Sequence, residues 1–273
     1  MSKKYTCSAV IGVFLLLQGC STFSPKEDTS LTMDGLKVMS LVNKRDRGED
    51  YIISSSWKLA KKGRIRHSMR YKEKRKNYGD EGDFIYKSVI RYIDPPRYYG
   101  TAILTWNYKE VKREHWFIRM QQSRRSAKRT VTPDLLNPPA ESDFSLADYI
   151  DINVDEETHQ LLSSKEYEGT MCFLVESVPA KKKLLYGKRI SWIDQQRVIP
   201  LKIEYYDKKG NLWKTLHIEW QNKDGLWFWK KAEVENIKVD YKTFINIEEV
   251  RVNIGLRERD FTKVSLETKE LGF

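Results

Sequence analysis

The chain has 273 residues, with 49 Lys and Arg against 38 Asp and Glu, so its formal charge is +11. Charged residues make up 32% of it, above the roughly 25% of a typical globular protein, yet 8 Trp, 15 Tyr and 10 Phe exclude a disordered chain. The three cysteines, Cys7, Cys20 and Cys172, are too few for a disulfide framework and lack the spacing of zinc ligands.

The first twenty residues have the order of a secretory signal peptide. Lys3 and Lys4 precede an apolar stretch over 9–17, which is far shorter than the roughly 20 residues a membrane-spanning helix needs. The segment Leu-Gln-Gly-Cys at 17–20 resembles the lipobox of bacterial lipoproteins. That resemblance implies a diacylglycerol on Cys20 and cleavage before it; an ordinary signal peptide with an incidental cysteine is the alternative. Ser21, where an Asp would imply inner-membrane retention, favours the outer membrane.

The predicted organisation is a signal peptide over 1–19, a lipidated tether over 20–31 and a single domain over 32–273. Loss of residues 1–19 would lower the formal charge from +11 to +9. Outside the cytoplasm a basic chain does not meet nucleic acid, so we expect an anionic membrane surface or an acidic envelope partner instead. The predicted location is the periplasm-facing side of the outer membrane.

Apolar residues at spacings of three and four predict an amphipathic helix from Met33 to about Asn43, with Asp34 as its cap. A second helix is expected near Ser145 and a further one over Glu156 to Ser163.

Most of the remaining chain alternates apolar and polar residues with period two. Three such runs are 102–108, 199–206 and 215–220, and turn residues such as Asp207 to Gly210 and Lys223 to Gly225 separate them. This pattern is typical of antiparallel sheet with one buried face. Because strand twist accumulates over a large sheet, the sheet must curl, and a helix or a ligand must cover its concave face.

Sequence motifs of the common enzyme classes and of nucleotide-binding loops are absent from the chain. The four histidines lie in separate segments, so no metal site and no cofactor are predicted, apart from the acyl anchor on Cys20. A hydrolase would require a polar cluster around Asp194, Asp143 or His115, which the spacing does not predict.

Basic residues cluster at 61–66, 72–76, 124–129 and 181–183. They fit solvated strand faces and loops, or a footprint for anionic head groups worth about 1 kcal/mol per residue.

Bulky residues on the alternating strands are candidates for the lining of an apolar cleft that holds an acyl chain, although a large aromatic core explains them equally well. The candidates are Trp57, Leu104, Trp106, Trp116, Trp192, Ile203, Leu216, Ile218 and Trp220.

Four segments, over 99–108, 142–148, 191–194 and 200–207, resemble the outer-membrane lipoprotein-sorting protein family, relatives of the carrier LolA. The likeness runs over about residues 33–266. It implies a mainly β (α+β) fold, a curled antiparallel half-barrel with a few helices covering the concave face. It also implies a non-enzymatic protein that binds membrane lipid or lipoprotein acyl chains, as LolA and its lipidated counterpart LolB do.

Two roles remain open. In the first, the cleft receives acyl chains in lipoprotein sorting or lipid transport, and the helix at 34–43 or the segment 141–163 acts as a lid. In the second, the cleft is filled by its own side chains, and the protein is an accessory subunit of an RND-type envelope exporter.

Overall fold

The computed structural model describes residues 33–79, 82–96, 101–109, 114–118, 128–130, 154–180 and 186–267. The chain divides into two compact units, Met1–Thr32 and Met33–Phe273, and all described residues belong to the second. None of the helices within these ranges has both the length and the apolar character needed to cross a membrane.

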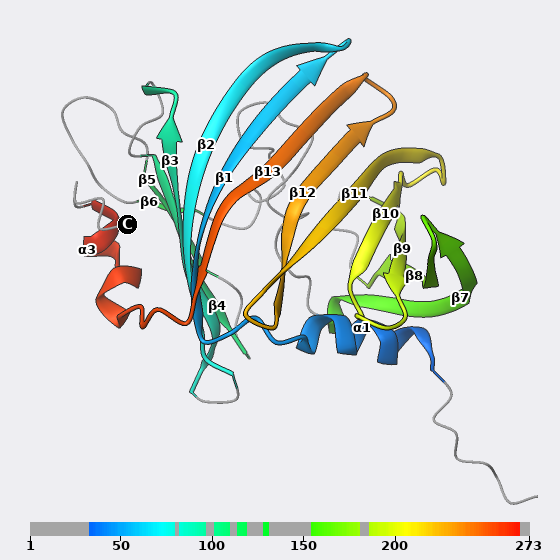
Figure 1. Ribbon diagram of the computed structural model, residues 1–273, viewed down its shortest axis with the longest axis horizontal. Coiled ribbons are helices and arrows are strands. Elements are labelled where there is room, and N and C mark those ends of the chain that lie inside the picture. Colours follow the sequence, from blue (N-terminus) through cyan, green and yellow to red (C-terminus); the bar gives the residue numbers. More distant parts are fainter. Residues whose placement is uncertain are drawn as a thin grey trace, which may run out of the picture. The chain divides into compact units, whose positions relative to one another are not determined.

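The described strands form one curled antiparallel sheet (Figure 1). Its spatial order is β6-β5-β4-β3-β2-β1-β13-β12-β11-β10-β9-β8-β7, so the order ends at β6 on one side and at β7 on the other. The strands are β1 Asp50–Lys61, β2 Arg64–Asn77, β3 Phe84–Asp94, β4 Ala102–Tyr108, β5 Glu114–Ile118, β6 Lys128–Thr130, β7 Glu157–Tyr167, β8 Thr170–Pro179, β9 Lys188–Asp194, β10 Pro200–Tyr206, β11 Leu212–Lys223, β12 Leu226–Asn236 and β13 Tyr241–Val252. The predicted half-barrel architecture is confirmed.

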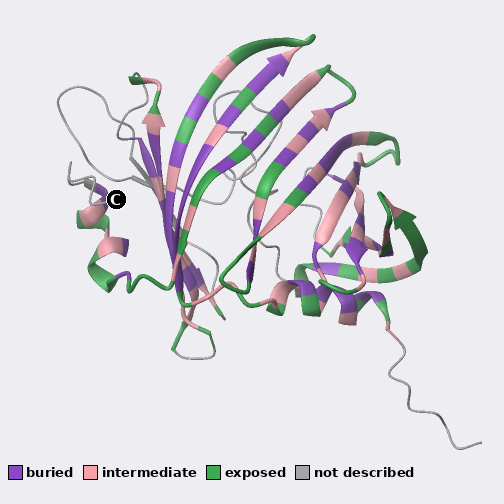
Figure 2. Cartoon of the chain, viewed as in Figure 1, coloured by how far each residue is buried: buried purple, intermediate pink, exposed green. Residues whose placement is uncertain are grey.

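The alternation read from the sequence corresponds to the two faces of this sheet, and burial alternates along its strands (Figure 2). On the inner face, Leu216 of β11 lies opposite Ile203 of β10 and Val234 of β12. These residues belong to a cluster of apolar and aromatic side chains that extends to β1 and β2, where Trp57 packs on Tyr71 with ring centroids 4.9 Å apart. Much of the inner face is therefore filled by the chain's own side chains.

Helix α1, Gly35–Lys44, confirms the helix predicted near Met33 to Asn43. The Oδ1 of Asp34 accepts a hydrogen bond from the Lys37 N–H at 2.7 Å, which caps the first turn as expected. The side chains of Val38, Met39 and Val42 are buried against β8 and β9. The helix thus covers the β7 to β9 side of the inner face (Figure 1).

The C-terminal segment packs on the outer face of β3, β4 and β5. It comprises the 3₁₀ turn η5, Glu258–Phe261, and the short helix α3, Lys263–Glu267. Asp50 fixes the chain that leads from β13 into this segment, since its two carboxylate oxygens accept hydrogen bonds from the N–H groups of Ile254 and Leu256 at 2.8 and 2.7 Å. Arg91 holds its end by donating to the Ser265 carbonyl at 2.6 Å.

One predicted helix is wrong. Residues 157–163, expected to be helical, belong to the edge strand β7, which is preceded by a 3₁₀ turn, η4, over Val154–Glu156. Pairing with β8 decides the conformation, because β7 is largely exposed and has little apolar periodicity of its own. The helix expected near Ser145 lies outside the described residues.

Candidate functional site

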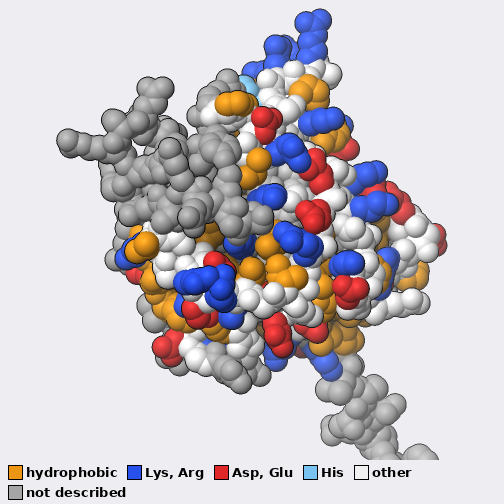
Figure 3. Space-filling model, turned by 60° about the vertical axis from the view of Figure 1, so that its left-hand side comes forward, with side chains coloured by type: hydrophobic (Ala, Val, Ile, Leu, Met, Phe, Trp, Pro, Cys, Tyr) orange, Lys and Arg blue, Asp and Glu red, His pale blue; other side chains and the backbone are white. Residues whose placement is uncertain are grey.

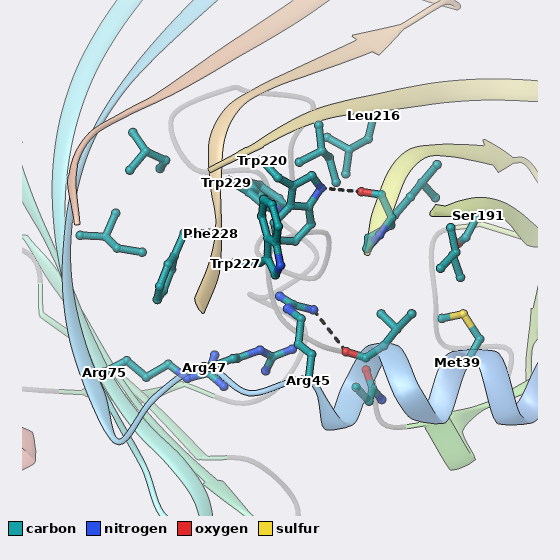
Figure 4. Close-up of a pocket in the computed structure, with 18 of the residues that line it drawn as sticks. Met39, Arg45, Arg47, Arg75, Ser191, Leu216, Trp220, Trp227, Phe228 and Trp229 are labelled. Atoms are coloured by element: carbon teal, nitrogen blue, oxygen red, sulfur yellow. Dashed lines mark hydrogen bonds between the residues drawn. The ribbon is translucent and has the colours of Figure 1, made fainter. Parts of the chain in front are cut away.

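A pocket opens between α1 and the inner face of the sheet (Figure 4). Residues of seven strands, from β9 through β13 to β1 and β2, contribute to its lining, because the sheet curls around it. Met39, Val42 and Asn43 of α1 form one side, and the connection from α1 to β1 adds Arg45 and Arg47.

The sheet side of the pocket is apolar and aromatic. Register places Ser191, Ile203 and Leu216 in one row across β9, β10 and β11. Trp220 lies further along β11, and its Nε1 donates a hydrogen bond to the Pro200 carbonyl at 2.7 Å. Figure 4 shows Trp220, Trp227, Phe228 and Trp229 gathered above the arginine side chains. Such a surface favours an apolar ligand.

Positive charge also lines the pocket. Arg45, Arg47, Arg75 and Arg189 line the pocket, whereas no Asp or Glu is among its described lining residues. The Arg45 guanidinium lies 5.1 Å from the Trp220 ring centroid and donates to the Val42 carbonyl at 3.3 Å. Arg75 lies 3.7 Å from the centroid of Tyr86 and donates to Asn77 Oδ1 at 2.8 Å. Positive charge therefore borders an apolar surface.

Arg189 forms an ion pair with Glu157 within the fold. Its Nε donates to Oε1 of Glu157 at 3.1 Å, and Tyr186 donates to the same oxygen at 2.8 Å. Burial alone would lower the pKa of Arg189, but the charge of Glu157 raises it well above its ordinary value. Arg189 therefore keeps its proton at any ordinary pH.

The cavity has a volume of about 130 Å³. A cavity of about 150 Å³ accommodates benzene, and pockets for larger ligands span roughly 300–1,000 Å³. The pocket as it stands therefore holds only a short apolar segment. Ser191 adds a buried hydroxyl whose Oγ finds no hydrogen-bond partner among the described residues.

Of the nine residues predicted for an acyl-chain cleft, the structure brings Ile203, Leu216, Ile218 and Trp220 together in this pocket. Trp57 shares the inner face but is packed in its aromatic cluster, with its Nε1 donating to Ser55 Oγ at 3.1 Å.

The other four predicted residues lie on the outer face. Leu104, Trp106 and Trp116 pack beneath the C-terminal segment, where Trp106 Nε1 donates to the Phe261 carbonyl at 2.9 Å. Trp192 lies beside Tyr167, with ring centroids 5.7 Å apart. The alternation of apolar and polar residues along a strand shows which side chains lie on the same face of the sheet. It does not show whether that face is the inner or the outer one.

Sequence reasoning expected the helix at 34–43 to cover the cleft as a lid, but it named neither Met39 and Val42 nor any of the four arginines as lining residues. The periodicity of a helix does not say which strands it covers. The arginines come from an irregular connection and two strands far apart in sequence, so only the fold brings them together.

Asp194, one of the polar groups considered for catalysis, has a structural role. It closes the β9–β10 turn, accepting at Oδ1 from the N–H groups of Gln196 and Arg197 at 2.8 and 3.0 Å. Burial opposes ionisation, but these bonds and the Arg197 guanidinium hold the pKa of Asp194 below its usual value. Burial raises the pKa of the Cys172 thiol to about 11, so it stays protonated.

Asp143 lies outside the described residues, as does Cys20, whose lipidation stays a prediction. Among the described residues, no group of three His, Cys, Asp or Glu side chains is placed to hold a metal ion.

The curled sheet and the helix-covered inner face define the LolA-like class of half-barrel proteins. A family model described as that of an uncharacterised protein matches residues 86–268, two thirds of the chain, and the chain belongs to that family. No curated protein matches the chain.

Solved structures agree on the fold. A putative outer membrane lipoprotein-sorting protein domain from Vibrio parahaemolyticus is 25% identical, with a TM-score of 0.77 over 86% of this chain and 98% of that one. A DUF1329 family protein from Desulfovibrio piger is 24% identical, with a TM-score of 0.77 over 85% and 97%. A LolA superfamily protein from Nitrosomonas europaea is 18% identical, with a TM-score of 0.63 over 85% and 99%. Of these three neighbours, the first is named for lipoprotein sorting and the third for the LolA superfamily.

Proposed function

We propose that this protein binds the acyl chain of a membrane lipid or lipoprotein in the pocket between α1 and the inner face, and acts in the cell envelope in lipoprotein sorting or lipid transport. The observation that carries the proposal is the pocket's two-sided lining. Apolar side chains of β10 to β13 face the guanidinium groups of Arg45, Arg47 and Arg75 (Figure 4). An amphiphile with an apolar chain and an anionic head group is complementary to that arrangement.

Binding of a full acyl chain requires the pocket to widen beyond its about 130 Å³. The stretch Arg45 to Arg47, which follows α1, is the part of the wall that belongs to neither a helix nor a strand. After it, Gly48 and Glu49 are hydrogen-bonded to Asn77 of β2 and to Asn253. Displacement of Arg45 to Arg47 would add volume without breaking the sheet. Burial of the chain then supplies about 25 cal/mol per Å² of apolar surface, so no catalytic group is needed.

The small cavity and the filled remainder of the inner face favour a second candidate. In that case the protein carries no lipid and is an accessory subunit of an RND-type envelope exporter, the partner that the family resemblance implies. The outer-membrane anchor through Cys20 is common to both candidates.

Native mass spectrometry of the chain with Cys20→Ser, purified from cells and followed by lipid extraction, distinguishes the candidates. We expect a stoichiometric phospholipid or acylated peptide. Ser191→Leu, which fills the pocket from a buried position, should abolish this ligand, and Ile203→Phe serves as a second filling variant. The matched control is Ser54→Leu, at a buried serine that does not line the pocket. A clean apo mass that persists with added lipids would reject the carrier role.

A further inference from the structure

Three hairpin tips lie side by side at one end of the sheet, and we name them together the hairpin rim. They are the β1–β2 tip over 61–66, the β10–β11 tip over 207–212 and the β12–β13 tip over 237–242. The Lys62 N–H donates to the Asp240 carbonyl at 3.1 Å and so joins the first tip to the third. The Ile237 N–H donates to the Trp213 carbonyl at 3.0 Å, and Lys238 pairs with Asp207, which joins the third tip to the second.

The tips are narrow and stiff. In the β1–β2 tip, Lys62 and Gly63 both have positive φ, 51° and 70°, as in the two-residue turns that match the twist of a hairpin. Asp207 braces the β10–β11 tip by accepting from the N–H groups of Lys209 and Asn211, both at 2.9 Å. The side chains at these tips are therefore held at the end of the sheet by a rigid backbone.

Large aliphatic side chains project from all three tips. Ile65 is 52% exposed, Ile237 50%, Val239 47% and Leu212 37%. Single exposed apolar residues are normal on a protein surface, but protruding aliphatic residues on three adjoining turns require an explanation. Neither the core nor the pocket uses them.

The same tips concentrate positive charge. The three ranges contain eight Lys and Arg against two Asp, a net charge of +6 out of +11 for the chain. One of the two acids, Asp207, is already paired with Lys238. Lys62, Arg64, Arg66, Lys208 and Lys209 are exposed. Figure 3 shows Lys and Arg side chains at the upper end of the molecule with hydrophobic side chains between them.

We propose that the hairpin rim docks on an anionic phospholipid surface, with its aliphatic side chains in the head-group region and its basic side chains on the phosphates. Each basic residue near such a surface contributes an affinity factor of about five, and apolar side chains that enter the interface add to it. Protruding apolar tips suit a deformable lipid interface, whereas a folded protein partner would need a matching cavity for each tip. This inference does not depend on the ligand proposed for the pocket.

Vesicle co-sedimentation of the compact unit over 33–273, which contains every described strand, tests the proposal without the lipid anchor. The vesicles are phosphatidylcholine alone or phosphatidylcholine with phosphatidylglycerol. We expect binding only to the latter and a decline in binding as salt is raised. The triple variant Lys62→Glu, Arg64→Glu, Lys209→Glu should bind at least about 100-fold more weakly.

The matched charge control is Lys230→Glu, Arg259→Glu, Lys263→Glu, which reverses three exposed basic residues away from the rim and should change binding by less than about tenfold.

A second pair of variants tests the apolar side chains. Ile65→Ser, Ile237→Ser, Val239→Ser should weaken binding, and its control Leu36→Ser, Ile254→Ser, Val264→Ser, at equally exposed positions, should not. Circular dichroism checks that each variant is folded. Equal losses for rim and control variants, or an absence of wild-type binding to anionic vesicles, would overturn the proposal; the second result would direct the search to an acidic protein partner.

Discussion

A Cβ atom placed on Gly35 would lie 2.6 Å from the carbonyl carbon of Gln160, in the middle of the edge strand β7. The first turn of α1 is therefore in direct contact with the backbone of β7, at a distance that only glycine permits. Together with the buried Val38, Met39 and Val42, this contact fixes the helix to the sheet. Any widening of the pocket must come from the residues that follow α1, and not from a swing of the helix itself.

We predict that Gly35→Ala destabilises the protein by about 1–3 kcal/mol, because the added methyl group overpacks the contact with β7. On a helix free to leave the sheet, the same substitution would stabilise by up to about 1 kcal/mol through helix propensity. The sign of the change therefore distinguishes a fixed helix from a mobile lid. Urea denaturation measures it, with Leu36→Ala, on the exposed side of the same turn, as the control.

How far the sequence predicts this fold depends on where each element buries its residues. The regular spacing of Val38 and Val42 indicated α1, and the alternation of Ile203 and Tyr205 indicated β10, because both elements bury one continuous face. In β7, by contrast, Leu162 is exposed and the strand is held mainly by backbone pairing with β8. Backbone pairing leaves no periodic signal in the side chains.

The site was predictable only in part, for a related reason. Leu216 and Ile218 were found because they share a strand face that lines the pocket. Leu104 has the same local pattern, yet the C-terminal segment around Phe261 covers it on the outer face. Which face receives a covering segment depends on contacts between residues more than 150 positions apart, as in the bond from Trp106 to Phe261.

The buried ion pair of Glu157 and Arg189 should be expensive to break. Their side chains are 1% and 11% exposed. We predict that Glu157→Gln destabilises the fold by about 3–5 kcal/mol, since it leaves the Arg189 charge buried without a counter-charge. The double variant Glu157→Met, Arg189→Met should cost less than Glu157→Gln alone.

Denaturant titration tests this prediction, with Glu219→Gln as the control. The Glu219 and Lys231 side chains are 60% and 56% exposed and 3.7 Å apart, so the control should change stability by no more than about 0.5 kcal/mol. If Glu157→Gln lowered the free energy of unfolding by as little as the control does, the ion pair between Glu157 of β7 and Arg189 of β9 would not contribute to stability.

Two buried serines should respond differently to the loss of their hydroxyl groups. Ser177 Oγ lies 2.8 Å from His159 Nδ1, whereas Ser191 Oγ, in the pocket, has no partner among the described side chains and backbone. We predict that Ser177→Ala costs about 1–3 kcal/mol and that Ser191→Ala is close to neutral. Thermal unfolding of the two variants side by side gives the comparison. A large cost for Ser191→Ala would mean that its hydroxyl is hydrogen-bonded in solution.

The environment of His159 should make stability depend on pH. Its Nε2 lies 3.0 Å from the Val154 carbonyl, which only accepts, so Nε2 carries the proton and Nδ1 accepts from the Ser177 hydroxyl. Burial lowers the pKa of His159, despite the opposing effects of the Val154 carbonyl and Glu157. The unfolded chain, with a histidine pKa of about 6.5, therefore binds a proton that the folded chain does not. The contribution of neutral His159 is complete above about pH 6.5 and is lost as the pH falls from there toward the lowered pKa.

We predict that His159→Gln reduces the acid-side slope of the unfolding free energy by up to about 1.4 kcal/mol per pH unit, the value for one proton. Denaturant midpoints between pH 8 and pH 5 measure this slope. Ser177→Ala is the control, because it removes the same hydrogen bond but keeps the titrating imidazole, and should lower stability at pH 8 while retaining a slope. Wild type and His159→Gln could instead lose stability in parallel as the pH falls. In that case His159 takes up its proton equally in the folded and the unfolded state, and the acid sensitivity of the fold arises from its carboxylates.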